Sequence, residues 1–277
     1  MVAVAVAGGT GDVGKTVVDQ VPSATANSGV KFVAVDYDDV EETAKTLEAH
    51  RVDTIISALN IEGPSEQAQL KLIAAAEKSQ VTRRFIPSEF AGETAPDDFT
   101  GPVLRAAKAL AESRLTYARV ANVMFMDYFG LPKHPEPSET FQLVPQRARA
   151  YSMLYSKDLA RFLDRLINEP EWQEWSIISG ADTCLNELVA LAEKITGDKF
   201  HVTYDSVADL GKGKSTPMFD DSASYNGMDP AAISAWIGLS VAQGKMLLPK
   251  DGRLNEKFPD VQPKPIERFM TEAWSKQ

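Results

Sequence analysis

The sequence predicts an α/β fold in which a doubly wound parallel sheet is followed by a smaller C-terminal lobe. Three observations indicate it: apolar, β-branched runs without polar alternation, helical segments that alternate strictly with them up to residue 122, and a weaker pattern afterwards. A strand that helices cover on both faces reads as such a continuous apolar run. The chain has 277 residues, of which 44% are hydrophobic, so it can form a large core.

The elements follow each other in a regular order along the first half of the chain. Strands are predicted at 2–7, 31–36, 53–59, 83–90 (ending in a turn) and 115–122. Helices are predicted between them at 12–20, 39–51, 65–80 and 101–113. Further on, helices are predicted at 156–170 and 186–197, after a proline-rich surface loop at 131–141. We therefore predict a first domain at 1–122, with its sheet completed by parts of 140–180, and a smaller lobe at 123–277.

Composition excludes several classes of protein. Acidic residues outnumber basic ones by 39 to 29, and the formal net charge of −10 repels nucleic acid in the absence of a basic cluster. No apolar run reaches the roughly 20 residues that a membrane-spanning helix needs. Cys184 is the single cysteine, which is typical of a reducing compartment, so we predict a cytoplasmic protein. The three histidines have no partners at metal-ligand spacing, so no metal site is expected.

A glycine-rich turn between the first strand and the first helix is the clearest functional motif. In "AVAGGTGDVGKTVV" (5–18) the glycines recur every third residue. Such a turn lets the backbone approach a pyrophosphate at a helix N-terminus, as in Rossmann-type folds, and the alternative is a tight turn without a ligand. Asp36, about 20 residues further on, is a candidate for the ribose, or it caps the end of its strand. The candidate contacts in the turn are Gly8, Thr10, Gly11, Asp12, Val13 and Gly14.

Three longer stretches carry a resemblance to a known family. The stretches "VDYDDVEETAKTLE" (35–48), "RRFIPSEFAG" (83–92) and "LTYARVANVMFMDYFG" (115–130) resemble the NmrA-like and isoflavone-reductase-like family of atypical short-chain dehydrogenases. The resemblance implies a Rossmann domain that binds NAD(P)H, with NADP as the family's usual cofactor. It also implies a substrate lobe at the C-terminus and a hydride-transfer site near the "SEF" turn.

The resemblance also assigns residues to the cofactor, beside the glycine turn. Asp36 and Tyr37 would lie beside adenine, and Ser57, Ala58 and Leu59 would line the ribose side. The nicotinamide would be approached by Pro87, Ser88, Glu89, Phe90 and Asn122. Glu89 itself has two readings, since it either orients a substrate hydroxyl or a ribose, or caps the following segment.

The chain departs from the family pattern at three places. Residues 21–29 replace a strand that ends in the residues that read the 2′-phosphate, so the choice between NAD and NADP stays open. The family's catalytic lysine position holds Val103, and Lys108 on the same predicted helix is the remaining candidate; its alternative is a solvated helix lysine. The segment 147–155 is also shorter than in relatives.

These features predict an NAD(P)-dependent reductase of a small apolar or aromatic metabolite. The alternative is a non-catalytic dinucleotide-sensing regulator of the NmrA type, which binds a protein partner. His134, in the proline-rich loop, is a further candidate proton donor, or an ordinary surface histidine.

Overall fold

The structure is a computed structural model that describes residues 3–20, 30–61, 65–92, 101–129, 141–142, 149–216 and 229–274. The chain divides into two units. The first comprises Met1–Ala121, Ser156–Ile178 and Gly252–Val261. The second comprises Asn122–Tyr155, Ser179–Asp251 and Gln262–Gln277. The predicted domain limits at 1–122 and 123–277 stay a prediction.

A parallel sheet forms the centre of the first unit. Its strands lie in the order β1 (Ala3–Ala7), β2 (Val52–Ser57), β3 (Arg84–Ile86) and β4 (Thr116–Tyr117). One residue after β4, the chain continues as β5 (Arg119–Ala121), which pairs in parallel with β9 (Trp175–Ile177). All carboxyl ends therefore point toward one edge of the sheet, as predicted for a doubly wound fold.

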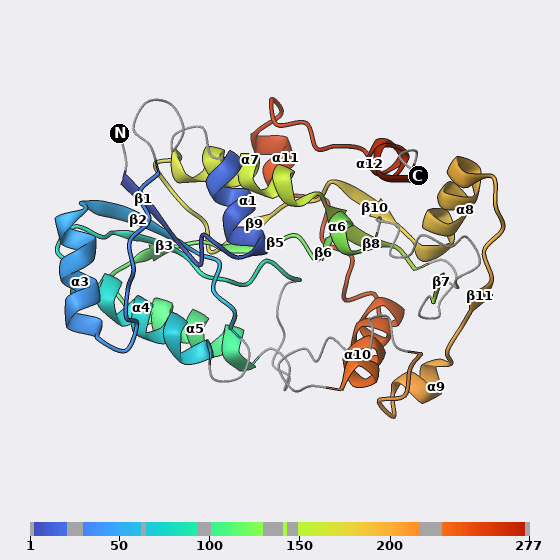
Figure 1. Cartoon of the computed structure of the whole chain (residues 1–277), viewed down its shortest axis with the longest axis horizontal. Coiled ribbons are helices and arrows are strands. Elements are labelled where there is room, and N and C mark those ends of the chain that lie inside the picture. The colour runs from blue at the N-terminus through green and yellow to red at the C-terminus, as the bar shows by residue number, and fades with distance from the viewer. Residues whose placement is uncertain are drawn as a thin grey trace. The chain divides into compact units, whose positions relative to one another are not determined.

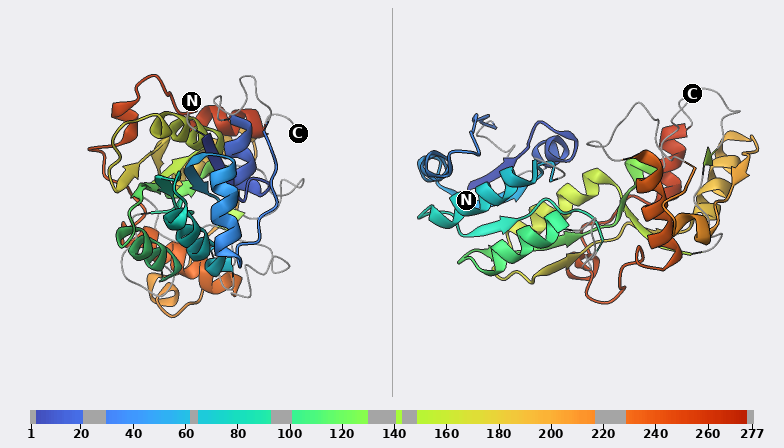
Figure 2. Two further views of the ribbon diagram at one scale, coloured as in Figure 1. Left: turned by 90° about the vertical axis from the view of Figure 1, so that its left-hand side faces the viewer. Right: turned by 90° about the horizontal axis from the view of Figure 1, so that it is seen from below.

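Helices cover both faces of this sheet (Figure 1). On one face α3, α4 and α5 lie side by side, as the left view of Figure 2 also shows, and on the other α1 packs against α7. Between the sheet and the first group lies a core that includes Ile55, Leu72, Phe85 and Leu110. The helix bounds are α1 (Asp12–Gln20), α3 (Val40–Ala49), α4 (Glu66–Lys78), α5 (Gly101–Ala111), α7 (Ser156–Ile167) and α11 (Leu254–Lys257).

The predicted strand at 31–36 is wrong. Residues 30–36 adopt no regular secondary structure, and Phe32 is 74% exposed. β1 pairs directly with β2, in a register that places Ala7 opposite Ser57. A β-rich composition forms a strand only where a neighbouring backbone supplies the ladder of hydrogen bonds, and no described residue supplies it to this segment. The other predicted strands and helices of the first unit are confirmed, apart from shifts of their ends and the interruption at Ala118.

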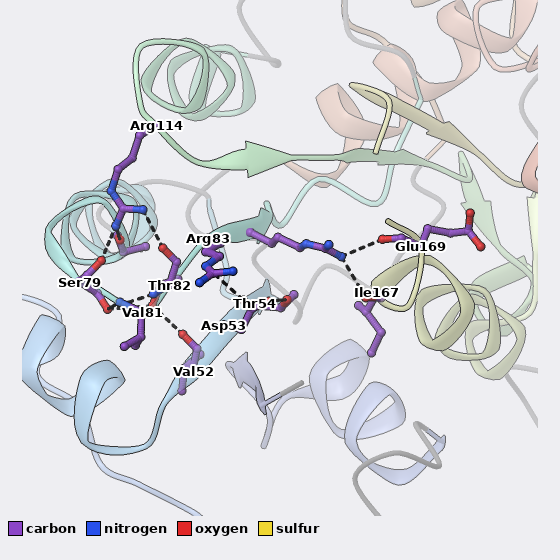
Figure 3. Close-up of polar contacts among 12 residues, drawn as sticks. Val52, Asp53, Thr54, Ser79, Val81, Thr82, Arg83, Arg114, Ile167 and Glu169 are labelled. Carbon is purple, nitrogen blue, oxygen red and sulfur yellow. Dashed lines mark hydrogen bonds and ion pairs between the residues drawn. The ribbon is translucent and has the colours of Figure 1, made fainter. Parts of the chain in front are cut away.

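The amino edge of the sheet is closed by arginine side chains (Figure 3). The guanidinium of Arg114 donates hydrogen bonds to carbonyl oxygens at the C-terminal end of α4, including those of Ala76 and Ser79, and to Thr82 O at 2.9 Å. Arg84 donates likewise to the carbonyls of Ile167 and Glu169 after α7, at 3.2 and 2.8 Å. These bonds satisfy carbonyl groups that a helix end leaves without intrahelical partners.

The second unit contains small sheets and several helices. Its three-stranded sheet has the order β10 (Ala181–Thr183), β8 (Tyr151–Leu154) and β6 (Met124–Phe125). β7 (Phe141–Gln142) pairs with β11 (Val202–Thr203). The predicted helix at 186–197 is confirmed as α8, which ends at the left-handed Gly197. The helices are α6 (Met126–Phe129), α8 (Leu185–Thr196), α9 (Val207–Leu210), α10 (Pro230–Ala242) and α12 (Ile266–Trp274). Among the described residues, no helix combines the length and the apolar character that crossing a membrane requires.

Candidate functional site

The glycine turn lies at the carboxyl end of β1, where it leads into α1. Gly8 has φ +78°, and a Cβ atom there would lie 2.6 Å from the carbonyl oxygen of Ala58. A Cβ on Gly14 would lie 2.2 Å from the oxygen of Gly8. Both positions therefore require glycine, the first for its backbone conformation and both for the close approach of neighbouring backbone.

Gly11 has a different environment within the same turn. Among the described residues, a Cβ there would meet only the oxygen of Gly8, at an ordinary 3.4 Å, and Gly11 is exposed together with Thr10 and Asp12. The first amides of α1, which begins at Asp12, have no acceptors within the helix and lie at the positive end of its dipole. The turn thus offers backbone donors to an anion on its exposed side.

The predicted adenine-side residues occupy two neighbouring segments of the first unit. The amide of Ala58 donates to Ala7 O at 2.8 Å, which extends the β1–β2 pairing into the loop. Tyr37 and Leu59 both pack against the core cluster of the first unit, and burial raises the pKa of the Tyr37 phenol. Asp36 is exposed, and its Oδ1 accepts a hydrogen bond from the amide of Asp38 at 2.9 Å. Their contact with an adenosine stays a prediction.

The turn after β3 is held by side chains rather than by glycine. The amide of Ser88 donates to Oε1 of the buried Gln69 on α4, at 2.8 Å. Glu89 is buried, and both of its carboxylate oxygens accept hydrogen bonds from Arg119. Phe90 is buried and has φ +36°, a conformation that is uncommon for a bulky residue. Sequence reasoning missed Gln69 and Arg119, although a charged residue inside the apolar stretch "LTYARVAN" was a usable signal.

Two predicted site residues carry buried polar atoms that no described group satisfies. The Oγ of Ser57, at the carboxyl end of β2, has no hydrogen-bond partner in the described part of the chain. The same holds for both side-chain atoms of Asn122, which directly follows β5. Buried polar groups in proteins are almost always paired, so these atoms are candidates for a hydrogen bond to a ligand or to a buried water. Val123, next to Asn122, has φ +60°, which is strained for a β-branched residue.

The candidate proton donors are less well supported by their surroundings. Lys108 lies on α5 with a side chain that is 76% exposed, and its Nζ is 3.9 Å from Oε1 of Glu112. Val103 lies on the same helix. His134 and the loop around it lie outside the described residues, as does the segment 21–29. Within the described ranges, no group of histidine, cysteine and carboxylate residues is suited to hold a metal ion. The catalytic assignment of Lys108 stays a prediction.

Sequence comparisons place these features among known proteins. The model of the NmrA-like family matches residues 21–212. Oxidoreductase swnN of Metarhizium robertsii is 28% identical over 337 residues, covering 99% of this chain and 98% of that protein. Oxidoreductase BOA1 of Botryotinia fuckeliana is 32% identical over 233 residues, covering 72% of this chain and 78% of that protein.

Solved structures show the same architecture. The complex of leucoanthocyanidin reductase with NADPH from Vitis vinifera has a TM-score of 0.81 at 17% identity, covering 99% of this chain and 100% of that one. Isoflavone reductase has a TM-score of 0.76 at 17% identity and 98% coverage of both chains. At this level of identity the similarity establishes the fold, and the predicted doubly wound α/β architecture is confirmed.

Proposed function

Because the chain belongs to the NmrA-like family, we propose that it is an NAD(P)H-dependent reductase of a small apolar or aromatic metabolite. The observation that carries the proposal is the turn from Gly8 to Gly14, whose backbone packing demands glycine while its exposed side presents amides at a helix N-terminus. The curated relatives are named oxidoreductases, and solved structures of the same fold include leucoanthocyanidin reductase with NADPH and AtPrR2 with NADP⁺.

The described residues fit a dinucleotide at the carboxyl edge of the sheet. The amides after Gly11 suit the diphosphate, and the unsatisfied hydroxyl of Ser57 suits a polar atom on the ribose side. When bound, a reduced nicotinamide supplies a hydride to the substrate. The segment Pro87–Phe90 of the first unit is proposed to face that ring, and a contact of Asn122 with it stays a prediction.

The substrate also needs a proton if a hydride adds to it. Lys108 and His134 are the candidates on this chain, although the exposed Lys108 side chain, 3.9 Å from Glu112, favours another source. Lys108→Ala tests the lysine. A fall in kcat with unchanged cofactor affinity assigns the proton to Lys108, and an unchanged kcat excludes it and leaves His134 or solvent.

Cofactor titration tests the proposal directly. NADPH and NADH are each titrated into the wild-type protein and into Gly11→Leu, with binding followed by nicotinamide fluorescence. We expect wild type to bind at least one cofactor and Gly11→Leu to bind it at least about tenfold more weakly, since the larger side chain blocks approach to the amides. Gly211→Leu is the matched control, because a Cβ there also meets a carbonyl oxygen at 3.4 Å on an exposed surface. Failure of wild type to bind either cofactor, or full binding by Gly11→Leu, overturns the proposal.

Turnover separates an enzyme from a sensor. Cofactor oxidation is measured with a panel of enone and aryl-ether substrates at saturating NADPH or NADH. Oxidation of the cofactor supports the reductase. Tight binding without turnover across the panel would instead support a dinucleotide-sensing regulator, and pull-down with the loaded protein would then search for its protein partner.

A further inference from the structure

Arg119 occupies an unusual place for a charged residue. It lies in β5, which pairs with β9 in a two-stranded sheet of the first unit, and its side chain is only 7% exposed. Its partner Glu89, in the turn after β3, has a side chain that is 1% exposed. Removing two charges from water costs several kcal/mol per ion, and an apolar pair of similar size often stabilises a protein as well. Stability alone therefore does not explain this pair.

The geometry of the pair fixes the direction of the Glu89 side chain. Nε and Nη2 of Arg119 donate to the two carboxylate oxygens of Glu89, at 2.9 and 2.7 Å. The guanidinium carbon lies 4.0 Å from the centroid of the Trp175 ring, and Nη1 is 3.6 Å from the carboxylate of Glu174 at the rim. A planar guanidinium is suited to this combination of a two-point hydrogen bond and a stacked ring, whereas a lysine ammonium is not.

The turn that Glu89 belongs to is strained and anchored on several sides. Phe90 has φ +36°, and a left-handed conformation costs a bulky residue about 1–2 kcal/mol. On the N-terminal side of Phe90, the amide of Ser88 donates to the Gln69 side chain. On its C-terminal side, Ala91 forms a parallel β-bridge with Ala121. Strain of this kind persists where the surroundings over-determine the conformation, typically at ligand sites.

We propose that Arg119 is a positioning residue that, through Glu89, holds the turn Pro87–Phe90 in the conformation that faces the cofactor. The proposal rests on the proposed function only for the identity of the ligand that the turn faces. It assigns Glu89 to the scaffold of the site, because both of its oxygens bind Arg119. It also explains why a charge is kept inside an otherwise apolar strand: the pair specifies a conformation rather than adding stability.

We call the Arg119–Glu89 pair, with the turn that it holds, the clamp. Four variants test it: Arg119→Met, Glu89→Gln, the double variant that combines them, and Arg119→Lys. The matched control is Arg84→Met, because Arg84 also lies on a strand of the first unit, β3, with its guanidinium over a tryptophan ring, that of Trp172. Arg84 donates instead to carbonyls at the amino edge of the parallel sheet. Urea unfolding measures stability, amide hydrogen exchange reports on residues 88–91, and NADPH titration with steady-state kinetics reports on the site.

We expect Arg119→Met and Glu89→Gln each to lower stability, because each leaves one buried charge without its partner, and the double variant to recover much of that stability. Arg119→Lys keeps the charge but loses the two-point hydrogen bond. In all four variants the amides of 88–91 should exchange about tenfold faster or more. The KM for NADPH should rise and kcat should fall by about tenfold, and the double variant should not recover either. Arg84→Met should lower stability and leave the exchange, KM and kcat unchanged.

Two results would overturn the proposal: unchanged exchange at 88–91 in Glu89→Gln and Arg119→Lys, or a double variant that regains cofactor affinity and turnover together with stability. If the wild type binds neither NADPH nor NADH, the proposed function fails by itself. Faster exchange at 88–91 in the variants then still supports the clamp, and unchanged exchange still refutes it.

Discussion

The two edges of the parallel sheet in the first unit differ in how they treat polar groups. At the amino edge, Arg114 and Arg84 donate to the carbonyls at the ends of α4 and α7, and Thr82 Oγ1 donates to Val52 O at 2.8 Å. At the carboxyl edge, the Ser57 hydroxyl has no described partner, and Phe90 is held in a left-handed conformation. Within the described residues, the amino edge pairs these polar groups inside the fold, and the carboxyl edge leaves a hydroxyl and the first amides of a helix without a partner.

This difference separates stability from function within one sheet. Polar groups that are hydrogen-bonded inside the fold stabilise it. Replacing them should reduce the free energy of unfolding without changing the affinity for a ligand. Unsatisfied or strained groups reduce stability. Replacing them should therefore change the affinity for a ligand more than the free energy of unfolding. The carboxyl edge is also where ligands bind in open α/β sheets. The following changes test the contrast, beginning with the largest expected effect.

Gly14→Ala should produce the largest effect, at the carboxyl edge. The new Cβ would lie 2.2 Å from the oxygen of Gly8 and 2.7 Å from its carbonyl carbon, so the turn or α1 must move. We expect a loss of about 3 kcal/mol in the free energy of unfolding, together with loss of cofactor binding. Urea unfolding and NADPH titration measure the two effects. Gly11→Ala is the control in the same turn, where the new Cβ has room and stability should stay near that of wild type.

Arg114→Met should affect the amino edge alone. It removes the hydrogen bonds to the carbonyls of Thr82, Ala76 and Ser79. Because the residue is largely exposed, water replaces part of what is lost, and we expect a decrease of about 1–3 kcal/mol in the free energy of unfolding. Cofactor affinity measured on the folded variant should remain that of wild type. A clear rise in the Kd would show that the two edges are not independent.

Ser57→Ala should produce the smallest change in stability. In contrast to Arg114→Met, it should lower the affinity for the cofactor and leave the fold as stable as before. It removes a buried hydroxyl that has no described partner, so the free energy of unfolding should stay the same or rise by up to about 1 kcal/mol. Cofactor affinity should fall by about threefold to tenfold if the hydroxyl bonds to the ribose side. Thermal unfolding with and without NADPH measures both effects. A destabilised variant with unchanged affinity would mean that the hydroxyl is satisfied within the fold.

Local sequence patterns predicted the parts of the site that depend on neighbouring residues. The turn from Gly8 to Gly14 and the bounds of α1 follow from glycine spacing and a strand-to-helix transition within a single stretch of chain. The same applies to α8, predicted at 186–197, which ends at the left-handed Gly197. In each case the residues that determine the structure lie within a few positions of one another, so their order in the sequence carries the information.

Contacts between distant segments could not be predicted in this way. The segment 30–36 has strand-forming residues but adopts no regular secondary structure, since no described strand pairs with it. The turn at Ser88–Phe90 was placed correctly after a strand, yet the sequence did not show that Gln69 and Arg119, 19 and 30 residues away from their partners, hold it.

The sequence by itself determined the alternating α/β order, the glycine turn and the family to which the chain belongs. Only the tertiary structure decided which strands pair, which polar groups stay unsatisfied, and that Glu89 is bound to Arg119. The reason is physical: backbone propensities and close packing around glycine act over a few residues, whereas strand pairing and burial of charge depend on which surfaces the folded chain brings together.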